Sequence, residues 1–304
     1  MAEFRLEFWP ARSPEAPIAF LTMARDETTL LEAWVKNGLR ICPEAAFFVI
    51  DHASSPSLSE SLANCPEYSG LNINFINIPP IPFDDDFKAM ALSGFAKMLL
   101  HCYDIVVSTD CDELLVGLGM GADKVLSKLQ SLDGITAPIG FEIVQHTDKE
   151  APFDASQDIE LQRGYGFFAS GYTKPVIWKT RSEFSAGLHR SREDFAYETS
   201  LGLLHLRSVD QEMSLERAAQ RRQYEISAGQ VDQGRGGNWL TPPEKKADFF
   251  ARLRSLDEIP TFSDLLDGFY SELTESHHKN GGGFWGHNIS KTSNYCDISG
   301  VLYV

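Results

Sequence analysis

The sequence lacks an apolar run of the roughly 20 residues that a helix needs to cross a bilayer. Its first residues include Glu3, Arg5 and Glu7, so they do not form the apolar core of a secretory signal. The five cysteines are scattered and form no Cys-x-x-Cys pair, so neither a zinc site nor a disulfide framework is indicated. These absences predict a cytoplasmic protein with reduced thiols and no transmembrane segment.

The chain also has few basic residues relative to acidic ones. The chain has 27 lysines and arginines against 43 aspartates and glutamates, which gives a formal net charge of −16. Because a field of that sign repels nucleic acid, we expect no nucleic-acid partner. We expect that a nucleotide diphosphate would need a bound metal ion to enter such an acidic protein. Internal repeats are absent, and the 304 residues suit one long α/β domain or one domain with a C-terminal extension.

The first third of the chain alternates between strand-like and helix-like patterns. Four apolar runs have the composition of buried strands: 17–23, 45–50, 71–78 and 105–108. Helical spacing fills the gaps, with starts near Thr29, Ser57 and Phe87. This order predicts a mostly parallel, twisted sheet with right-handed crossovers and helices on its faces.

The rest of the chain is less regular. Helical patterns occur at 122–132, 214–227, 243–256 and 262–274, and strand-like stretches at 134–144, 175–180 and 201–206. The polar segment 146–171 predicts a long loop over the functional site. The charged run 216–222 is typical of a solvated helix face.

The most informative segment is 104–115, in which an apolar strand is followed by Asp110, Asp112 and Glu113. In open α/β sheets, ligands bind beyond the carboxyl ends of the strands. Two carboxylates spaced Asp-x-Asp can point at one ion, and such hard oxygens suit Mg²⁺ or Mn²⁺, which can bridge the phosphates of a nucleotide. The segment therefore predicts a metal-assisted nucleotide site.

Two further polar clusters follow the first two strands, at 25–27 and 51–55. If the sheet is parallel, these clusters and the Asp-x-Asp segment meet at one edge and form the rim of a pocket. The acids at 84–86 are better explained as the start of a helix, stabilised by its dipole. Lys88, just behind them, could face the phosphates.

These segments resemble the opening of family-2-like GT-A glycosyltransferases. FLTMARDE at 20–27 followed by LEAWV at 31–35 is similar to their first strand, their (Arg/Lys)-(Asn/Asp)-Glu turn and their Leu-x-Glu-Trp helix. VIDHASS at 49–55 is similar to their Asp-x-x-Ser segment, and TDCDELL at 109–115 to their Asp-x-Asp-Glu-Phe metal motif. Asp26 and Leu114 depart from the commoner Asn and Phe. The similarity fades after about residue 116.

The resemblance implies a GT-A, Rossmann-like catalytic domain over 1–208 and a helical C-terminal extension over 209–304 packed on the same domain. It implies transfer of a sugar, with a hexose expected, from a nucleotide sugar, with a UDP-sugar expected. The acceptor would be a hydroxyl of a glycan, a lipid-linked molecule or a small molecule. The resemblance also implies a divalent cofactor, Mn²⁺ or Mg²⁺.

Carried over residue by residue, the resemblance places Arg25, Glu27 and Asp51 at the nucleoside. Asp110 and Asp112 would hold the ribose, the diphosphate and the metal, and Asp112 would be catalytic. Lys88 would contact the phosphates of the donor.

A downstream histidine often completes such a metal site. We expect His189, beside Arg190, to be that ligand or a diphosphate contact. His205 lies inside an apolar strand and is expected in the core, and His287 lies in a Gly-rich tail that is expected to be flexible.

An inverting transfer needs a general base for the acceptor hydroxyl, whereas a retaining transfer need not have one. Glu142, Asp148, Asp154 and Asp158 lie in or beside the predicted loop, and the sequence does not choose among them. We take Glu142 and Asp148 as the catalytic candidates.

Three other classes use similar patterns. A phosphatase of the haloacid-dehalogenase type expects Thr two positions after the second Asp and an N-terminal motif, whereas this chain has Leu114 and three preceding strands. A nucleotidyltransferase would show a Gly-rich loop after the first strand, where this chain has residues 25–27. A non-catalytic sugar- or nucleotide-binding protein on the same fold is the third alternative, and the intact Asp110 and Asp112 argue against it.

Overall fold

The computed structural model describes residues 17–63, 65–232, 242–254, 259–289, 295–299 and 301–302. Its strands are β1 (Ile18–Ala24), β2 (Ala46–His52), β3 (Ile73–Ile78), β4 (Ile105–Ser108), β5 (Glu113–Gly117), β6 (Ile135–Val144), β7 (Tyr165–Phe168), β8 (Ile177–Trp178), β9 (Ala196–Ser208), β10 (His277–Lys279), β11 (Trp285–His287) and β12 (Cys296–Asp297). Its α-helices are α1 (Thr28–Ile41), α2 (Leu58–Ala63), α3 (Asp85–Leu99), α4 (Ala122–Ser131), α5 (Ile159–Gln162), α6 (Gln211–Arg221), α7 (Ala228–Asp232), α8 (Pro243–Arg254) and α9 (Phe262–Glu275).

The first four strands form a parallel block in the order β3-β2-β1-β4. Every residue of β1 and β4 is buried, as expected of strands that are covered on both faces. Alternate residues of β1 face opposite sides, so Phe20 packs in one cluster with Trp34 of α1, and Leu21 packs in another with Leu92 of α3. The predicted α/β fold, with a mostly parallel sheet flanked by helices, is confirmed.

The strands after β4 extend the sheet beyond β4, while β3 remains the edge strand on the other side. β8 lies antiparallel between β4 and β6, and β9 runs parallel to β6. Of the ten strands described in this sheet, seven share one direction, and β5, β7 and β8 are reversed.

β5 is a strand that the sequence pattern does not reveal. It begins directly after the Asp-x-Asp segment and pairs antiparallel with β9, with Glu113 opposite His205. The backbone amide of Leu206 donates a hydrogen bond of 2.7 Å to the carbonyl of Asp112. This pairing brings the end of β9 to the motif.

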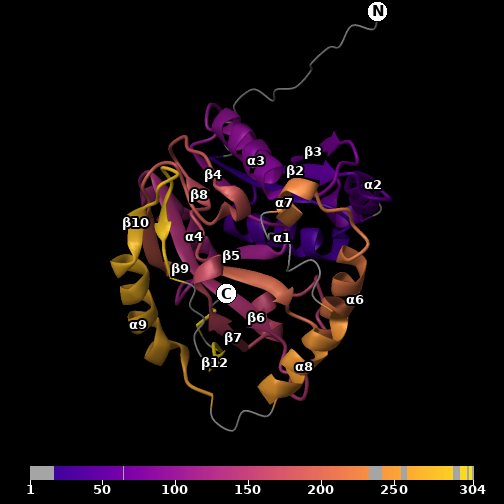
Figure 1. Cartoon of the computed structure of the whole chain (residues 1–304), viewed down its shortest axis with the longest axis vertical. Coiled ribbons are helices and arrows are strands. Elements are labelled where there is room, and N and C mark those ends of the chain that lie inside the picture. Colours follow the sequence, from indigo (N-terminus) through magenta and orange to yellow (C-terminus); the bar gives the residue numbers. More distant parts are fainter. Residues whose placement is uncertain are drawn as a thin grey trace, which may run out of the picture.

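The described residues after 208 pack on the core of the sheet. Phe262, Phe269 and Leu273 of α9 are buried in the cluster that holds Phe141 and Phe168. Figure 1 shows α6 and α8 along one side of the sheet and α9 along the other. The described residues after 208 contain the helices α6 to α9, the hairpin β10-β11 and strand β12. The boundary at residue 208 stays a prediction. None of the described helices has both the length and the apolar composition of a membrane span.

Helix α3 starts where the acids at 84–86 predict it. The Asp84 carboxylate accepts hydrogen bonds of 2.9 Å from the backbone amides of Asp86 and Phe87, as an N-cap does. The first turns of α3 therefore have a fixed position, and they carry Asp85 and Lys88 into the wall of the cleft described next.

Candidate active site

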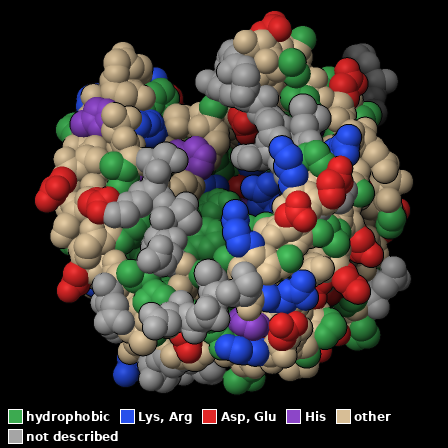
Figure 2. All heavy atoms as spheres, turned by 60° about the horizontal axis from the view of Figure 1, so that its bottom comes forward, with side chains coloured by type: hydrophobic (Ala, Val, Ile, Leu, Met, Phe, Trp, Pro, Cys, Tyr) green, Lys and Arg blue, Asp and Glu red, His purple; other side chains and the backbone are tan. Residues whose placement is uncertain are grey.

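An open cleft lies beyond the carboxyl ends of β1 and β4. Figure 2 shows a hollow in this face of the molecule, with lysine and arginine side chains gathered along it. The lining residues come from segments far apart in the sequence: Met23, Ala24, Arg25, Glu27, His52, Phe83, Asp85, Lys88, Asp110, Cys111, Asp112, Tyr172, Lys174, Gly187, His189, His205, Arg207, Arg221 and Tyr224. The polar clusters after β1 and β4 thus meet at one edge, as the parallel sheet predicts.

The loop after β1 forms one end of the cleft. Asp26 adopts a left-handed conformation with φ of 54°, which non-glycine residues rarely adopt. Its carboxylate accepts hydrogen bonds from the Tyr224 hydroxyl at 2.7 Å and from the Ser55 amide at 2.8 Å. The Arg25 guanidinium lies 4.4 Å from the centre of the Tyr224 ring. This end of the cleft therefore presents a flat aromatic and guanidinium surface.

Asp110 faces two lysines. Lys88 Nζ lies 2.5 Å from one carboxylate oxygen, and Lys174 Nζ lies 3.3 Å from the other. Lys174 also pairs at 2.6 Å with the fully buried Glu113. Burial alone would raise the pKa of the Asp110 carboxyl, but the two ammonium charges outweigh it and hold that pKa below its ordinary value.

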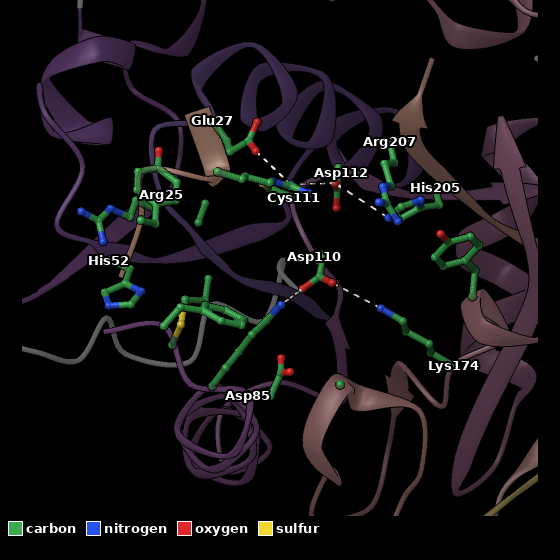
Figure 3. Close-up of a pocket in the computed structure, with 18 of the residues that line it drawn as sticks. Arg25, Glu27, His52, Asp85, Asp110, Cys111, Asp112, Lys174, His205 and Arg207 are labelled. Atoms are coloured by element: carbon green, nitrogen blue, oxygen red, sulfur yellow. Dashed lines mark hydrogen bonds and ion pairs between the residues drawn. The ribbon is translucent and has the colours of Figure 1, made fainter. Parts of the chain in front are cut away.

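Asp112 faces arginines from α6 instead. Arg217 Nη2 lies 2.8 Å from Asp112 Oδ2, and Arg221 Nη2 lies 3.6 Å from the same oxygen. Both arginines also contact Glu27, at 2.8 and 3.1 Å. Burial would raise the pKa of Asp112, but His205 and the two arginines lower it well below its ordinary value. Figure 3 shows the Asp110 carboxylate turned toward Lys174 and the Asp112 carboxylate near His205 and Arg207.

His205 and Arg207 enter the cleft from the end of β9. They are two positions apart on a strand, so their side chains point to the same face. His205 Nδ1 lies 2.6 Å from Oε2 of the buried Glu142, and His205 Nε2 lies 3.8 Å from Asp112 Oδ2. The His205 ring stacks on Tyr172 with centroids 3.9 Å apart. Glu142 therefore fixes the orientation of the imidazole from behind.

Six of the site residues predicted from the sequence line this cleft: Arg25, Glu27, Lys88, Asp110, Asp112 and His189. Asp51 does not line it. The residue is 1% exposed, and its carboxylate accepts hydrogen bonds from the backbone amides of Ser54 and Leu58 at 2.9 and 2.8 Å. Asp51 thus shapes the loop after β2, and its contact with the nucleoside stays a prediction.

The two candidate bases lie away from the cleft surface. Glu142 does not line the cleft, but it contacts His205, which does. The Asp148 side chain is 65% exposed and lies 3.8 Å from Arg254 of α8. The expectation that 146–171 forms a loop over the site is wrong, because none of the lining residues comes from this segment. It contains α5 and β7, and β7 is held at the far part of the sheet by pairing with β6.

The histidines also differ from expectation. His205, expected in the core, is 8% exposed yet lines the cleft. His287, expected in a flexible tail, lies in β11 of an antiparallel hairpin and contacts the Tyr197 hydroxyl at 3.1 Å. The glycines before β11 form the turn of this hairpin.

Sequence reasoning missed the cations that complete the site. Lys174, Arg207 and Arg221 line the cleft, and Arg217 lies behind it, with a side chain 8% exposed. The expectation that 216–222 is a solvated helix face is therefore wrong for Arg217. Arg217 and Arg221 are four positions apart, so they share one face of α6. This spacing is the sequence feature that could have predicted a common site for the two arginines.

The donor types at the cleft suit Mn²⁺ or Mg²⁺, but their placement does not. Among the described residues, no three His, Cys, Asp or Glu side chains converge as metal ligands do. An ion between Asp112 and His205 would compete with Arg217 for the same carboxylate oxygen. The residues as placed thus do not fit the predicted metal, and ligation by Asp110, Asp112 and His189 stays a prediction.

No family model and no curated protein matches the sequence. Among solved structures, the chain is similar to Staphylococcus aureus TarS residues 1–349, with a TM-score of 0.36 and 10% identity, covering 78% of this chain and 73% of that one. It is similar to the mannosyltransferase PcManGT from Pyrobaculum calidifontis, in complex with GDP-Man and Mn²⁺, with a TM-score of 0.38 and 14% identity, covering 71% and 64%. Similarity to the galactosyltransferase LgtC has a TM-score of 0.28 and 23% identity over 40% and 46%. Because all three TM-scores are below 0.5, none of these proteins' activities is transferred to this chain.

Proposed function

We propose that this protein is a glycosyltransferase that moves a sugar from a nucleotide sugar to an acceptor hydroxyl. The observation that carries the proposal is the cleft beyond β1 and β4, where the Asp-x-Asp segment meets lysines and arginines from five other segments. A diphosphate needs cations, and a protein with a net charge of −16 offers them in few places. A UDP-sugar is the first donor to test, in line with the resemblance of residues 17–116.

The two ends of the cleft suit the two ends of such a donor. The Arg25 and Tyr224 surface can stack on a nucleobase, and Lys88, Lys174 and Arg207 lie toward the diphosphate side. The sugar would then lie near His205 and Tyr172. This orientation agrees with the prediction that Arg25 and Glu27 lie on the nucleoside side.

The reaction is a substitution at the anomeric carbon of the donor sugar. An acceptor oxygen forms a bond to that carbon, and the bond between the carbon and the phosphate oxygen breaks with its electron pair going to the diphosphate. The acceptor proton leaves to a base or to solvent. The cations of the cleft stabilise the charge that develops on the leaving diphosphate.

A nucleotidyltransferase is the alternative on a related fold. It uses the same kind of sheet edge, but it would attack the α-phosphate and release pyrophosphate. The loop after β1 contains no glycine, and its left-handed residue is Asp26. No described feature favours this alternative over sugar transfer.

The test is a screen of UDP-, GDP- and dTDP-sugars by thermal shift, followed by detection of the released nucleoside diphosphate. A ligand at a hundredfold excess over its Kd stabilises the native state by about 2.7 kcal/mol. We expect one nucleotide class to raise the melting temperature and its sugar form to be hydrolysed slowly without an acceptor. Release of pyrophosphate from a nucleoside triphosphate and a sugar phosphate would instead establish the alternative.

A further inference from the structure

We propose that this cleft neutralises the donor diphosphate with its own lysines and arginines, without a divalent metal, and that Asp110 and Asp112 orient those cations. The inference rests on the nucleotide-sugar function proposed above. The sequence alone predicts that the two aspartates bind a metal ion, and this inference assigns them a different role, the positioning of basic side chains.

The surroundings of Asp110 are the first argument. Each of its two carboxylate oxygens faces an ammonium group, Lys88 at 2.5 Å and Lys174 at 3.3 Å. A divalent ion bound to Asp110 would lie within a few ångströms of two positive charges, which repel it. Lys174 cannot easily withdraw, because its side chain is only 5% exposed and Glu113 holds it at 2.6 Å.

The surroundings of Asp112 are the second argument. The carboxylate oxygen nearest His205 accepts a hydrogen bond of 2.8 Å from Arg217. Arg217 is anchored from a second side, because its Nε donates to Glu27 at 2.9 Å. A metal ion at this oxygen of Asp112 would have to displace a buried guanidinium that two carboxylates hold in place.

Unbalanced positive charge beside Asp112 is the third argument. Arg207 lines the cleft, and none of the described carboxylates lies within ion-pair distance of it. Lys246 of α8 is close by: burial, and then the charge of Arg207, lower the pKa of Lys246 to about 8. Cations that repel one another in this way are stabilised when an anion binds between them.

The numbers of basic and acidic side chains that line the cleft agree with a site for an anion. The lining side chains include five cations, Arg25, Lys88, Lys174, Arg207 and Arg221, against four carboxylates, Glu27, Asp85, Asp110 and Asp112. The whole chain shows the opposite ratio, 27 basic to 43 acidic residues. The cleft is therefore locally enriched in positive charge, and Figure 3 shows Lys174 and Arg207 directed toward the space around the two aspartates.

The experiment measures binding rather than turnover. UDP, GDP and dTDP are titrated calorimetrically into the protein in excess EDTA and again in Mn²⁺, with wild type, Arg207→Gln, Arg207→Lys and the control Arg192→Gln. Arg192 lies over the Phe284 ring, outside the cleft, with a side chain 43% exposed. Melting curves of each apo variant establish that it is folded.

We expect one nucleotide to bind in EDTA with an affinity within about threefold of that in Mn²⁺. Arg207→Gln should weaken binding in EDTA by about tenfold or more, since a hydrogen bond to a charged group is lost. Arg207→Lys should recover part of that loss, and Arg192→Gln should bind as wild type does.

Two results would overturn the inference and leave the proposed function standing. One is nucleotide binding that appears only with Mn²⁺, and the other is unchanged affinity of Arg207→Gln in EDTA. Failure of every nucleotide and nucleotide sugar to bind under both conditions would instead reject the proposed function, and the inference with it.

Discussion

Arg217 Nη2 lies 2.8 Å from Asp112 Oδ2, although 105 positions separate the two residues. The same guanidinium donates through Nε to Glu27 at 2.9 Å. One arginine of α6 therefore joins the loop after β1 to the Asp-x-Asp segment after β4. Because the pair is nearly buried, removing one member leaves carboxylates without a partner in a place that water reaches poorly.

Arg217→Met should consequently destabilise the fold. We expect a loss of about 3–5 kcal/mol in the free energy of unfolding, the range for breaking a buried ion pair by removing one partner. Urea denaturation followed by circular dichroism measures it. Arg222→Met is the matched control, because Arg222 is exposed on the same helix end and should change stability by less than about 0.5 kcal/mol. Equal effects of the two substitutions would contradict the assignment.

Glu142→Gln should reduce stability at pH 7 by an amount that shrinks in acid. Burial raises the pKa of Glu142, but His205 outweighs burial and keeps this pKa below the ordinary 4.5. A carboxyl whose pKa is lowered by folding stabilises the native state above its unfolded pKa, and that contribution is lost as the pH falls through the folded value. Unfolding curves between pH 7 and 3 for wild type and variant test this, because the contribution is lost only below pH 4.5. A difference that stays constant, or grows, below pH 4.5 would show that the contact with His205 is not its source.

Lys246→Met should stabilise the apo protein near neutral pH. Burial and the neighbouring Arg207 lower the pKa of Lys246 from 10.5 to about 8, so the charged form is disfavoured in the folded state. Below pH 8 the lysine is protonated in both states and the cost is fully present; between pH 8 and 10.5 it declines, and stability rises with pH. The gain is at most about 3 kcal/mol, from about 1.4 kcal/mol per pKa unit.

The control for Lys246→Met is Lys245→Met, because Lys245 is exposed on the same helix. Denaturation at pH 7 and pH 9.5 compares the two variants with wild type. Our account fails if Lys246→Met is destabilising at pH 7, or if its gain is larger at pH 9.5 than at pH 7.

Asp51→Ala should act through the loop after β2. The buried carboxylate accepts two backbone hydrogen bonds, from Ser54 and Leu58, and its loss leaves those amides unpaired. We expect a loss of about 2–3 kcal/mol in stability, since each unsatisfied buried group costs about 1–3 kcal/mol. Asp133→Ala, at an exposed position, should be near neutral. Wild-type stability of Asp51→Ala, together with weaker nucleotide binding, would favour a direct contact with the nucleoside instead.

Much of the fold follows from local pattern. The strands β1 to β4 are short apolar runs with helical spacing between them, and both signals depend on neighbouring residues only. Strand β5 was missed because the aspartates before Glu113–Gly117 were interpreted as metal ligands, whereas Cys111 and Asp112 form the turn that starts the strand. The segment 146–171 was misplaced because its polar composition indicates a loop but does not indicate which side of the sheet the loop covers.

The sequence by itself determined one edge of the site. Once the first strands are parallel, the residues after β1 and β4 must meet, so Arg25, Glu27, Asp110 and Asp112 come together without further information. Helix α3 follows β3 in the same block, and this places Lys88 opposite Asp110.

Only the tertiary structure decided which charges face those carboxylates. Lys174 reaches Asp110 because β8 pairs with β4, and Arg207 reaches the cleft because β9 pairs with β5. Arg217 and Arg221 arrive on a helix that follows β9. These contacts join residues about 60 to 110 positions apart. The pattern of charges along the sequence does not indicate which distant side chain each charged residue contacts. The sequence pattern therefore predicts that Asp110 and Asp112 are metal ligands, whereas in the folded protein they lie beside lysines and arginines.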